Sequence, residues 1–410
     1  MISKRSERLL GERPPLVKAH FEAVADPYHP SANPEGYVNF GAAENRLLWD
    51  LEEPILNAPR GLEPRDVHYR ELYGTPEARA AVARFLGRTT GVAVDAEDIV
   101  LMSGASAILD TLAATLADAG EAIAIPTPYY PGFDHDLTAR ADVQIAPVPL
   151  SSADGYMLTP ERVDKAIARA ESSGRRVRAV LVNTPHNPLG RVYPPGLVGG
   201  LIDLVARREI HLVVDEIYAN SVYGGDPFAS ALALAHREPG RVHLVYGLAK
   251  DFGLSGLKVG VLHTRNPQVR AAMREHAYLA PVSTDTQALV ARLLADDAWT
   301  TRLVETSRER LRKAYETTTD ALAAHGIPFL PATAGLFVWI DLRGALAAPT
   351  LEAEKTLWRA LFERGRVNVS PGHVFHESEP GWFRLCFADD PSVVAEGVRR
   401  IARIARERGA

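Results

Sequence analysis

The segment 241–260 reads RVHLVYGLAKDFGLSGLKVG and joins an apolar run, which ends near Tyr246, to a glycine-rich bend that holds Lys250. A short run of β-branched and aliphatic residues between turn-forming residues predicts a buried strand. A lysine just past such a strand has apolar surroundings that disfavour its charged form. A neutral amine is what attack on a carbonyl carbon requires. Most lysines after strands are simply solvated, so the catalytic interpretation needs support from elsewhere in the chain.

Other buried apolar runs are also followed by polar residues at or just after their carboxyl ends. Strands are expected at 98–102, 177–183 and 210–218, and they alternate with helical segments such as 197–207. This alternation predicts an α/β fold with a doubly wound, mostly parallel sheet. Ligand sites of such sheets lie beyond the carboxyl ends of the strands. The residues that fall at or just after those ends are Asn187, Asp215, Tyr218 and Lys250.

Length and composition describe an ordinary globular enzyme. With 410 residues, the chain is expected to form a large cofactor-binding domain over 66–295 and a smaller α+β domain over 296–410, with 1–65 as an N-terminal arm that completes the smaller one. The net charge of −5 gives no basic face for nucleic acid. We expect no signal peptide, no membrane span and, from the lone Cys386, a reducing cytoplasm.

Two further stretches have the composition of a ligand site. The strand at 98–102 turns directly into a helix at Ala105 and Ser106, whose free backbone N–H groups suit an anion, although ordinary strand-to-helix junctions look the same. Tyr129 and Tyr130 are expected to be exposed on a stiff proline-rich loop, as packing residues or as a stacking platform.

These residues together meet the needs of a pyridine aldehyde cofactor bonded to Lys250. The cofactor requires a carboxylate at its ring nitrogen, donors to its phenolic oxygen, an aromatic face and an anion site for its phosphate. The candidates are Asp215 for the ring nitrogen, Asn187 and Tyr218 for the phenolic oxygen, and Tyr130 for the aromatic face. For the phosphate they are Ala105, Ser106 and Lys258. Arg384 is the candidate for binding a substrate carboxylate with two donors.

The chain resembles the fold-type I enzymes that depend on pyridoxal phosphate (PLP), in the class I/II aminotransferase group. Within that group it is most similar to the 1-aminocyclopropane-1-carboxylate (ACC) synthases. The resemblance runs from about residue 20 to 390 and rests on PYHPSANPEGYVNFGAAENRL, PTPYYPGFDHDL, NPLG, IHLVVDEIY, VHLVYGLAKDFGLSGLKVG, GLFVWIDLR and VNVSPGHVFHESEPGWFRLCFA.

The resemblance implies a role for each matching residue. Lys250 is then the Schiff-base lysine and proton-transfer base, and Tyr130 stacks on the cofactor. Arg384 binds the substrate α-carboxylate, Tyr129 lies beside the substrate, and Glu44 belongs to the element that recognises S-adenosylmethionine (SAM). From its residues alone, Glu44 is better interpreted as a charge at a helix N-terminus. The resemblance also implies a homodimer.

The chain departs from the family pattern around the cofactor phosphate. Gly247 and Ala249 occupy positions where the family has serines. Lys258 replaces an arginine, and Leu109 replaces an asparagine. Leu72 stands for the tyrosine that reaches the neighbouring subunit's site, and either Tyr69 or Tyr73 is expected to replace it. A lysine keeps the charge of an arginine but not its two-pronged geometry.

We expect the enzyme to remove the α-proton of SAM and expel methylthioadenosine from Cγ. The residues expected around the cofactor phosphate differ from the family pattern. The favoured outcome is therefore coupling of the four-carbon unit to a second substrate, such as the nicotinamide nucleotide NAD, in natural-product biosynthesis. The alternatives are ring closure to ACC, amino-acid transamination and a non-enzymatic PLP-binding regulator.

Overall fold

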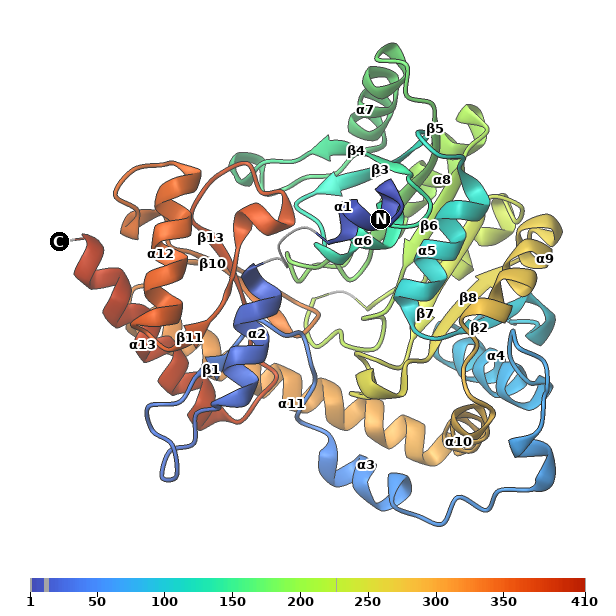
Figure 1. Ribbon diagram of the computed structural model, residues 1–410, viewed down its shortest axis with the longest axis horizontal. Helices are drawn as coiled ribbons and strands as arrows, with labels where there is room; N and C mark the ends of the chain where they lie inside the picture. The colour runs from blue at the N-terminus through green and yellow to red at the C-terminus, as the bar shows by residue number, and fades with distance from the viewer. Residues whose placement is uncertain (1, 11–14, 226, 410) are drawn as a thin grey trace.

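The computed structural model describes residues 2–10, 15–225 and 227–409, and a large mixed sheet forms the centre of its larger lobe (Figure 1). Within these residues the sheet has seven strands in the order β2-β8-β7-β6-β5-β3-β4. β8 is antiparallel to both of its neighbours, and the other pairs are parallel. The predicted doubly wound, mostly parallel α/β fold is therefore confirmed. The strands are β2 (Ile99–Met102), β3 (Ala122–Thr127), β4 (Gln144–Pro149), β5 (Val177–Asn183), β6 (His211–Asp215), β7 (Val242–Gly247) and β8 (Gly260–Thr264).

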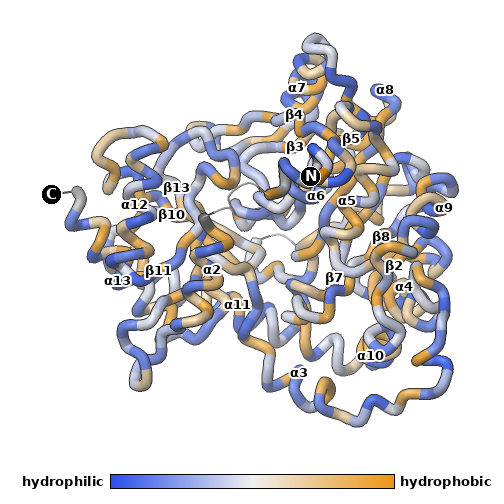
Figure 2. The backbone as a smooth tube through the Cα atoms, viewed as in Figure 1, coloured by the Kyte–Doolittle hydropathy of each residue, from blue (hydrophilic) through white to orange (hydrophobic). Residues whose placement is uncertain are grey.

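Helices cover both faces of this sheet because its strands are apolar on both sides. In β5, Val180 and Val182 join the core beneath one set of helices, while Ala179 and Leu181 join the core on the opposite face. Hydrophobic residues accordingly concentrate around the sheet in Figure 2. One face carries α5 (Ala105–Leu116), α6 (Gly132–Thr138) and α9 (Pro267–His276); the other carries α4 (Pro76–Thr90), α7 (Pro160–Ser172), α8 (Pro195–Arg208) and α10 (Thr284–Ala295).

The smaller lobe contains an antiparallel sheet and a short parallel pair that brings in the N-terminal region. Among the described residues, the sheet has the order β12-β13-β10-β9 and the pair joins β1 to β11. The long helix α11 (Asp297–Ala324) contacts α10 of the larger lobe and α13 of the smaller one (Figure 1). The domain boundaries at residues 65 and 295 stay predictions. The elements are β1 (Val38–Asn39), β9 (Phe329–Leu330), β10 (Phe337–Asp341), β11 (Val367–Asn368), β12 (Ser370–Pro371), β13 (Trp382–Cys386), α12 (Leu351–Glu363) and α13 (Pro391–Gly409).

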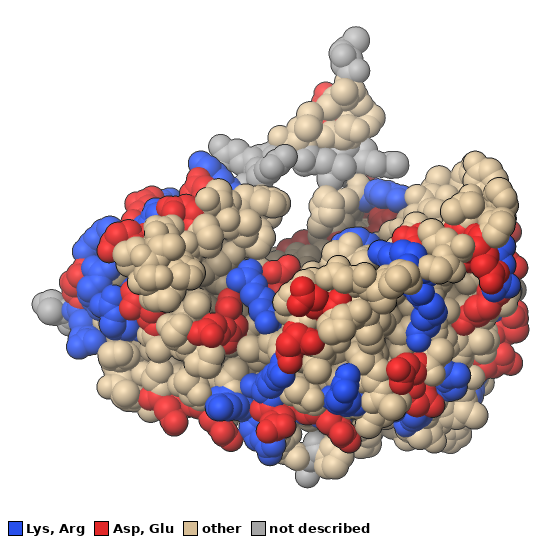
Figure 3. Space-filling view, turned by 90° about the horizontal axis from the view of Figure 1, so that it is seen from below, with Lys and Arg blue, Asp and Glu red and all other residues tan. Residues whose placement is uncertain are grey.

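The N-terminal region contains the α-helices α1 (Lys4–Leu9), α2 (Pro15–Ala25) and α3 (Trp49–Leu56). No helix in the part of the chain that the structure describes is both long and apolar enough to cross a membrane. On the face shown in Figure 3, acidic and basic side chains are interspersed over the surface.

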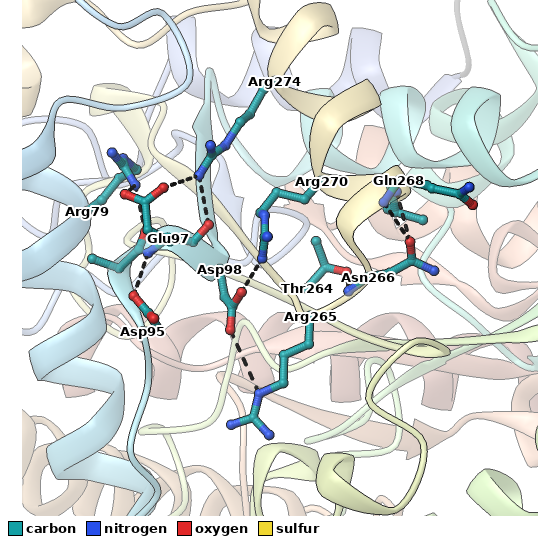
Figure 4. Close-up of polar contacts among 12 residues, drawn as sticks. Arg79, Asp95, Glu97, Asp98, Thr264, Arg265, Asn266, Gln268, Arg270 and Arg274 are labelled. Atoms are coloured by element: carbon teal, nitrogen blue, oxygen red, sulfur yellow. Dashed lines mark hydrogen bonds and ion pairs between the residues drawn. The ribbon is translucent and has the colours of Figure 1, made fainter.

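An ion-pair network fixes the chain just before β2 (Figure 4). Glu97 accepts hydrogen bonds from Arg79 of α4 at 2.8 Å and from Arg274 of α9 at 3.0 Å, and Asp98 pairs with Arg270. The bonds from Arg79 and Arg274 lower the pKa of Glu97 to about 2. Because β2 leads directly into α5, this network also positions the start of α5.

Candidate active site

A cavity opens at the carboxyl ends of the central strands, where the sequence predicted a ligand site. Residues from the larger lobe line it, and most of the predicted cofactor-binding residues are among them. The lining residues are Gly104, Ala105, Ser106, Leu109, Tyr130, Phe133, Asp136, Asn183, Asn187, Asp215, Ile217, Tyr218, Ala249, Lys250, Ser255, Lys258 and Val259.

Lys250 lies in the loop that follows β7 and points its amine into the cavity. Its Nζ donates a hydrogen bond to the backbone oxygen of Ala43 at 2.7 Å. Burial, reinforced by the positive charge of Arg384, lowers the pKa of Lys250 to about 8, although Glu44 and Asp215 act in the opposite direction. A buried lysine with this pKa is in part a neutral amine near pH 8, which is the form that attacks an aldehyde.

Asp215 is the last residue of β6, and its carboxyl group is buried. Its Oδ1 accepts a hydrogen bond from the backbone N–H of Ile217 at 3.1 Å. Burial raises the pKa of Asp215 to about 7, and the negative charge of Asp136 adds to this, whereas Lys250 opposes it. A protonated ring nitrogen placed beside Asp215 would gain a hydrogen bond and a counter-charge that its burial makes strong.

The start of α5 offers an anion site. Its N-cap residue is Gly104, whose φ of +93° lies in the region that glycine tolerates best. The Nζ of Lys258 lies 3.6 Å from the position that a Cβ on Gly104 would occupy, so the ammonium group sits against the helix start. Backbone N–H groups, a helix dipole and a cation together fit a phosphate.

Arg384 extends from β13 of the smaller lobe toward the same cavity. It donates to Asn187 Oδ1 at 3.1 Å and to the backbone oxygen of Gly41 at 2.6 Å. The rings of Phe375 and Phe337 lie 5.0 and 5.6 Å from its guanidinium carbon. Its Nε is buried and has no hydrogen-bond partner among the described residues. A buried guanidinium with an unused donor fits a substrate carboxylate.

The remaining predicted cofactor contacts also border the cavity. Tyr130 is 39% exposed, lines the cavity and has its ring perpendicular to that of Phe133, with the ring centroids 5.5 Å apart. Tyr218 is buried after the end of β6, and Asn187 lies within hydrogen-bond distance of Arg384. These residue types, in this arrangement, fit the ring and phenolic oxygen of PLP.

Tyr129 and Glu44 do not line the cavity. The expectation that Tyr129 is exposed is wrong: it is 4% exposed, and its hydroxyl donates to Asp134 at 2.6 Å. Its ring belongs to an apolar core cluster of the larger lobe and stacks on His376 of the smaller lobe. Glu44 lies 3.4 Å from the guanidinium of Arg46 and accepts a hydrogen bond from Ser255 Oγ at 3.4 Å. The helix that follows Glu44 begins at Trp49, so Glu44 is not in its first turn.

The two candidate tyrosines for the neighbouring subunit differ sharply. The ring of Tyr73 faces the guanidinium groups of Arg274 at 4.5 Å and Arg79 at 5.2 Å. Tyr69 is fully exposed. Which of the two tyrosines reaches a second subunit stays a prediction.

Several lining residues were missed from the sequence. Asp136 lies on α6, accepts a hydrogen bond from Ser106 Oγ at 3.3 Å, and has its pKa raised to about 6, chiefly by burial. It lies in the stretch PTPYYPGFDHDL, but nothing in that pattern distinguishes it from Asp134, which is not part of the lining. The backbone oxygen that receives the Lys250 bond had no signal in the sequence, because backbone atoms carry none.

The two positions that lack the family's serines differ in the space they offer. A Cβ at Gly247 would come within 2.8 Å of the backbone oxygen of Val259, so a serine there requires the backbone to shift. Ala249 lines the cavity, where a serine hydroxyl would face the ligand.

A sequence model of the family described as aminotransferase class I and II matches residues 35–401. The chain belongs to this family. It is 37% identical to a 1-aminocyclopropane-1-carboxylate synthase of Glycine max, over 95% of the chain and 85% of that protein. It is 39% identical to 1-aminocyclopropane-1-carboxylate synthase 5 of Oryza sativa subsp. japonica, over 92% of the chain and 75% of that protein.

Solved structures agree on the fold. The aspartate aminotransferase of Thermus thermophilus with maleate matches with a TM-score of 0.83 at 24% identity, over 98% of the chain and 99% of that chain. The corresponding enzyme of Rhizobium meliloti matches with a TM-score of 0.83 at 23% identity, over 100% and 99%. The chain is therefore a PLP-dependent enzyme of fold type I that resembles ACC synthases, and its cavity fits that cofactor.

Proposed function

We propose that the enzyme acts on SAM, closes a three-membered ring to form ACC and releases methylthioadenosine. The observation that carries this proposal is the Lys250 amine in the cavity, with Arg384 and Glu44 each bonded to a residue of its lining, Asn187 and Ser255. The relatives named as ACC synthases favour ring closure over the coupling reaction, which the sequence analysis favoured because the residues around the phosphate differ from the family pattern. Coupling to a nicotinamide nucleotide therefore becomes the second candidate.

The residues divide the reaction between them. When bound, PLP supplies an electron sink for the electrons released at Cα. Arg384 holds the α-carboxylate, and Lys250 takes the proton from Cα. A bond then forms between Cα and Cγ while the bond from Cγ to sulfur breaks, and its electron pair leaves with methylthioadenosine. SAM thus yields ACC, methylthioadenosine and one proton.

Glu44 is proposed to select the sulfonium substrate. Its carboxylate accepts a hydrogen bond from Ser255, which lines the cavity, whereas Glu44 itself does not line it. Glu44 therefore lies at the edge of the site. A carboxylate near a sulfonium gains Coulomb energy that a neutral thioether cannot supply.

We also propose a cytoplasmic homodimer in which Tyr69 enters the partner's site. Among the exposed apolar side chains, Leu62, Val67 and Tyr69 lie in one segment and Tyr278 and Leu279 in another. The hydrogen bond from Thr284 to the backbone oxygen of Asp66 brings the first segment against the start of α10, just after the second. Such a joint patch is typical of a subunit interface. Light scattering that shows an active monomer would contradict the dimer.

Product analysis tests the function directly. Purified holoenzyme is incubated with SAM, alone and with NAD or a keto acid, and products are identified by mass spectrometry. Ring closure predicts equal amounts of methylthioadenosine and ACC from SAM alone. A four-carbon adduct that needs NAD would favour the coupling reaction. Amino-group exchange with a keto acid, without methylthioadenosine, would instead make the enzyme an aminotransferase.

A further inference from the structure

A loop of the smaller lobe, residues 372–381 between β12 and β13, contacts the larger lobe beside the cavity. The backbone N–H of Tyr129 donates to the backbone oxygen of Phe375 at 2.9 Å. Asp134 accepts from the hydroxyl of Tyr129 at 2.6 Å on one oxygen, and its other oxygen lies 2.7 Å from Nε2 of His376. The rings of Tyr129 and His376 stack at 4.5 Å. We call Tyr129, Asp134 and His376 the lobe clamp.

The lobe clamp fixes the residue that lies against Arg384. Phe375 is fully buried, with its ring 5.0 Å from the guanidinium carbon of Arg384 and edge-on to Trp339 at 5.4 Å. Its backbone oxygen is the one that Tyr129 holds, and His376 is the next residue. A shift of the clamp would therefore move the aromatic surface on which the guanidinium rests.

The far side of the same loop is anchored within the smaller lobe. The buried carboxylate of Glu354 on α12 accepts from the backbone N–H and from Nδ1 of His373, at 3.0 and 2.6 Å, and from the backbone N–H of Gly381. Glu354 thus holds both ends of the loop. Between these ends the loop meets the larger lobe at Phe375 and His376, and again at Glu379, which accepts hydrogen bonds from Ser151 and Ser152.

We infer that Tyr129, Asp134 and His376 are positioning residues, which hold Phe375 against Arg384 and so preset the donors that receive the substrate carboxylate. This inference rests on the proposed role of Arg384. The side chains of Asp134 and His376 are 44% and 43% exposed, and exposed ion pairs contribute little to stability. His376 also has a φ of +61°, a strained backbone that histidine adopts at a cost. A costly and partly exposed contact beside the cavity is better explained by orientation of the site than by stability.

Ligand binding to the holoenzyme separates orientation from stability. L-Methionine and 3-(methylthio)propylamine share an amine and a thioether, but only the first carries a carboxylate. Spectral titration gives the Kd of each for the wild type and for Asp134→Ala, His376→Asn, His376→Gln and Arg384→Ala. His236→Asn, at an exposed histidine outside the clamp, is the matched control.

We expect Asp134→Ala and His376→Asn to raise the Kd of methionine about tenfold, because a small misplacement of a positioning group weakens oriented binding by this order. The Kd of the amine and the melting temperature should stay unchanged. His376→Gln keeps a donor at similar reach and should restore methionine binding to within about threefold of wild type. Tyr129→Phe, which keeps the ring stack and the backbone bond, should give a smaller shift in the same direction.

The outcomes distinguish this inference from the proposed function. If Arg384→Ala does not weaken methionine relative to the amine, the proposed role of Arg384 is wrong and the inference falls with it. If Arg384→Ala discriminates but the clamp variants bind both ligands like wild type, only the inference is overturned. Equal losses for both ligands together with a lower melting temperature would show that the clamp is structural, which also overturns it.

Discussion

Capture of PLP by the apoenzyme should depend on pH through Lys250. The pKa of Lys250 is lowered to about 8, first by burial and then by the charge of Arg384. Only the neutral amine attacks the aldehyde, so capture should accelerate as the pH rises toward 8 and level off above it. An ordinary solvated lysine would continue to accelerate toward pH 10.

The shift sets the size of the effect. The pKa of Lys250 falls from the ordinary value of 10.5 to about 8, which corresponds to about 3 kcal/mol between the two protonation states. At pH 7.5, roughly a quarter of Lys250 is then neutral, against roughly 0.1% of a lysine with the ordinary value. Capture at this pH should thus be about 200-fold faster than the ordinary pKa allows.

Stopped-flow absorbance after mixing apoenzyme with PLP at pH 6–10 measures the profile. Capture by free Nα-acetyl-lysine at each pH corrects for the titration of PLP itself, and Lys250→Ala should show no covalent capture. Arg384→Met removes a charge that lowers the pKa, so its midpoint should move to higher pH. A corrected wild-type midpoint near pH 10 would refute the burial argument.

Four other changes have definite expected results. Arg384→Ala should lower kcat/KM about 10²- to 10⁴-fold, because it removes two charge-assisted hydrogen bonds, and Arg384→Lys should recover only part of this in a methylthioadenosine-release assay. Glu44→Gln should raise the KM for SAM about tenfold with no change in alanine binding; an unchanged KM would remove Glu44 from recognition. Lys258→Arg restores a two-pronged donor and should tighten PLP about tenfold in equilibrium dialysis. Burial lowers the pKa of His243 to about 3, below the value of the unfolded chain. The stability that the neutral imidazole contributes is therefore lost as the pH falls from about 6.5 toward 3, by up to about 1.4 kcal/mol per pH unit. His243→Gln should reduce this loss of stability, as measured by urea unfolding.

The sequence predicted the central sheet well because its strands are continuous apolar runs. The strand expected at 177–183 is β5, with the same bounds. The strand expected at 210–218 ends instead at Asp215, because Ile217 and Tyr218 belong to the turn beneath the cavity although their side chains suit a strand. The antiparallel direction of β8 could not be predicted, since strand direction depends on the path of the chain rather than on the pattern within the strand.

The site was predictable where function is tied to a strand end and unpredictable where it depends on distant contacts. Asp215 and Lys250 follow apolar runs, and both line the cavity. Tyr129 was expected in solvent because its loop is rich in proline, yet His376, far away in the sequence, covers its ring. Residues brought together across two lobes leave no local pattern in either segment.

The short segment 41–44 shows why neither lobe is complete alone. Its backbone oxygen at Gly41 receives a hydrogen bond from Arg384 of the smaller lobe, and the one at Ala43 receives a bond from Lys250 of the larger lobe. Its last residue, Glu44, accepts from Ser255 on the Lys250 loop and raises the pKa of Lys250, against the effect of Arg384. A displacement of this segment would therefore change the orientation of Arg384 and the protonation of Lys250 together. Under the roles proposed for Arg384 and Lys250, these four residues would couple carboxylate binding by one lobe to proton transfer by the other, because both side chains are hydrogen-bonded to them.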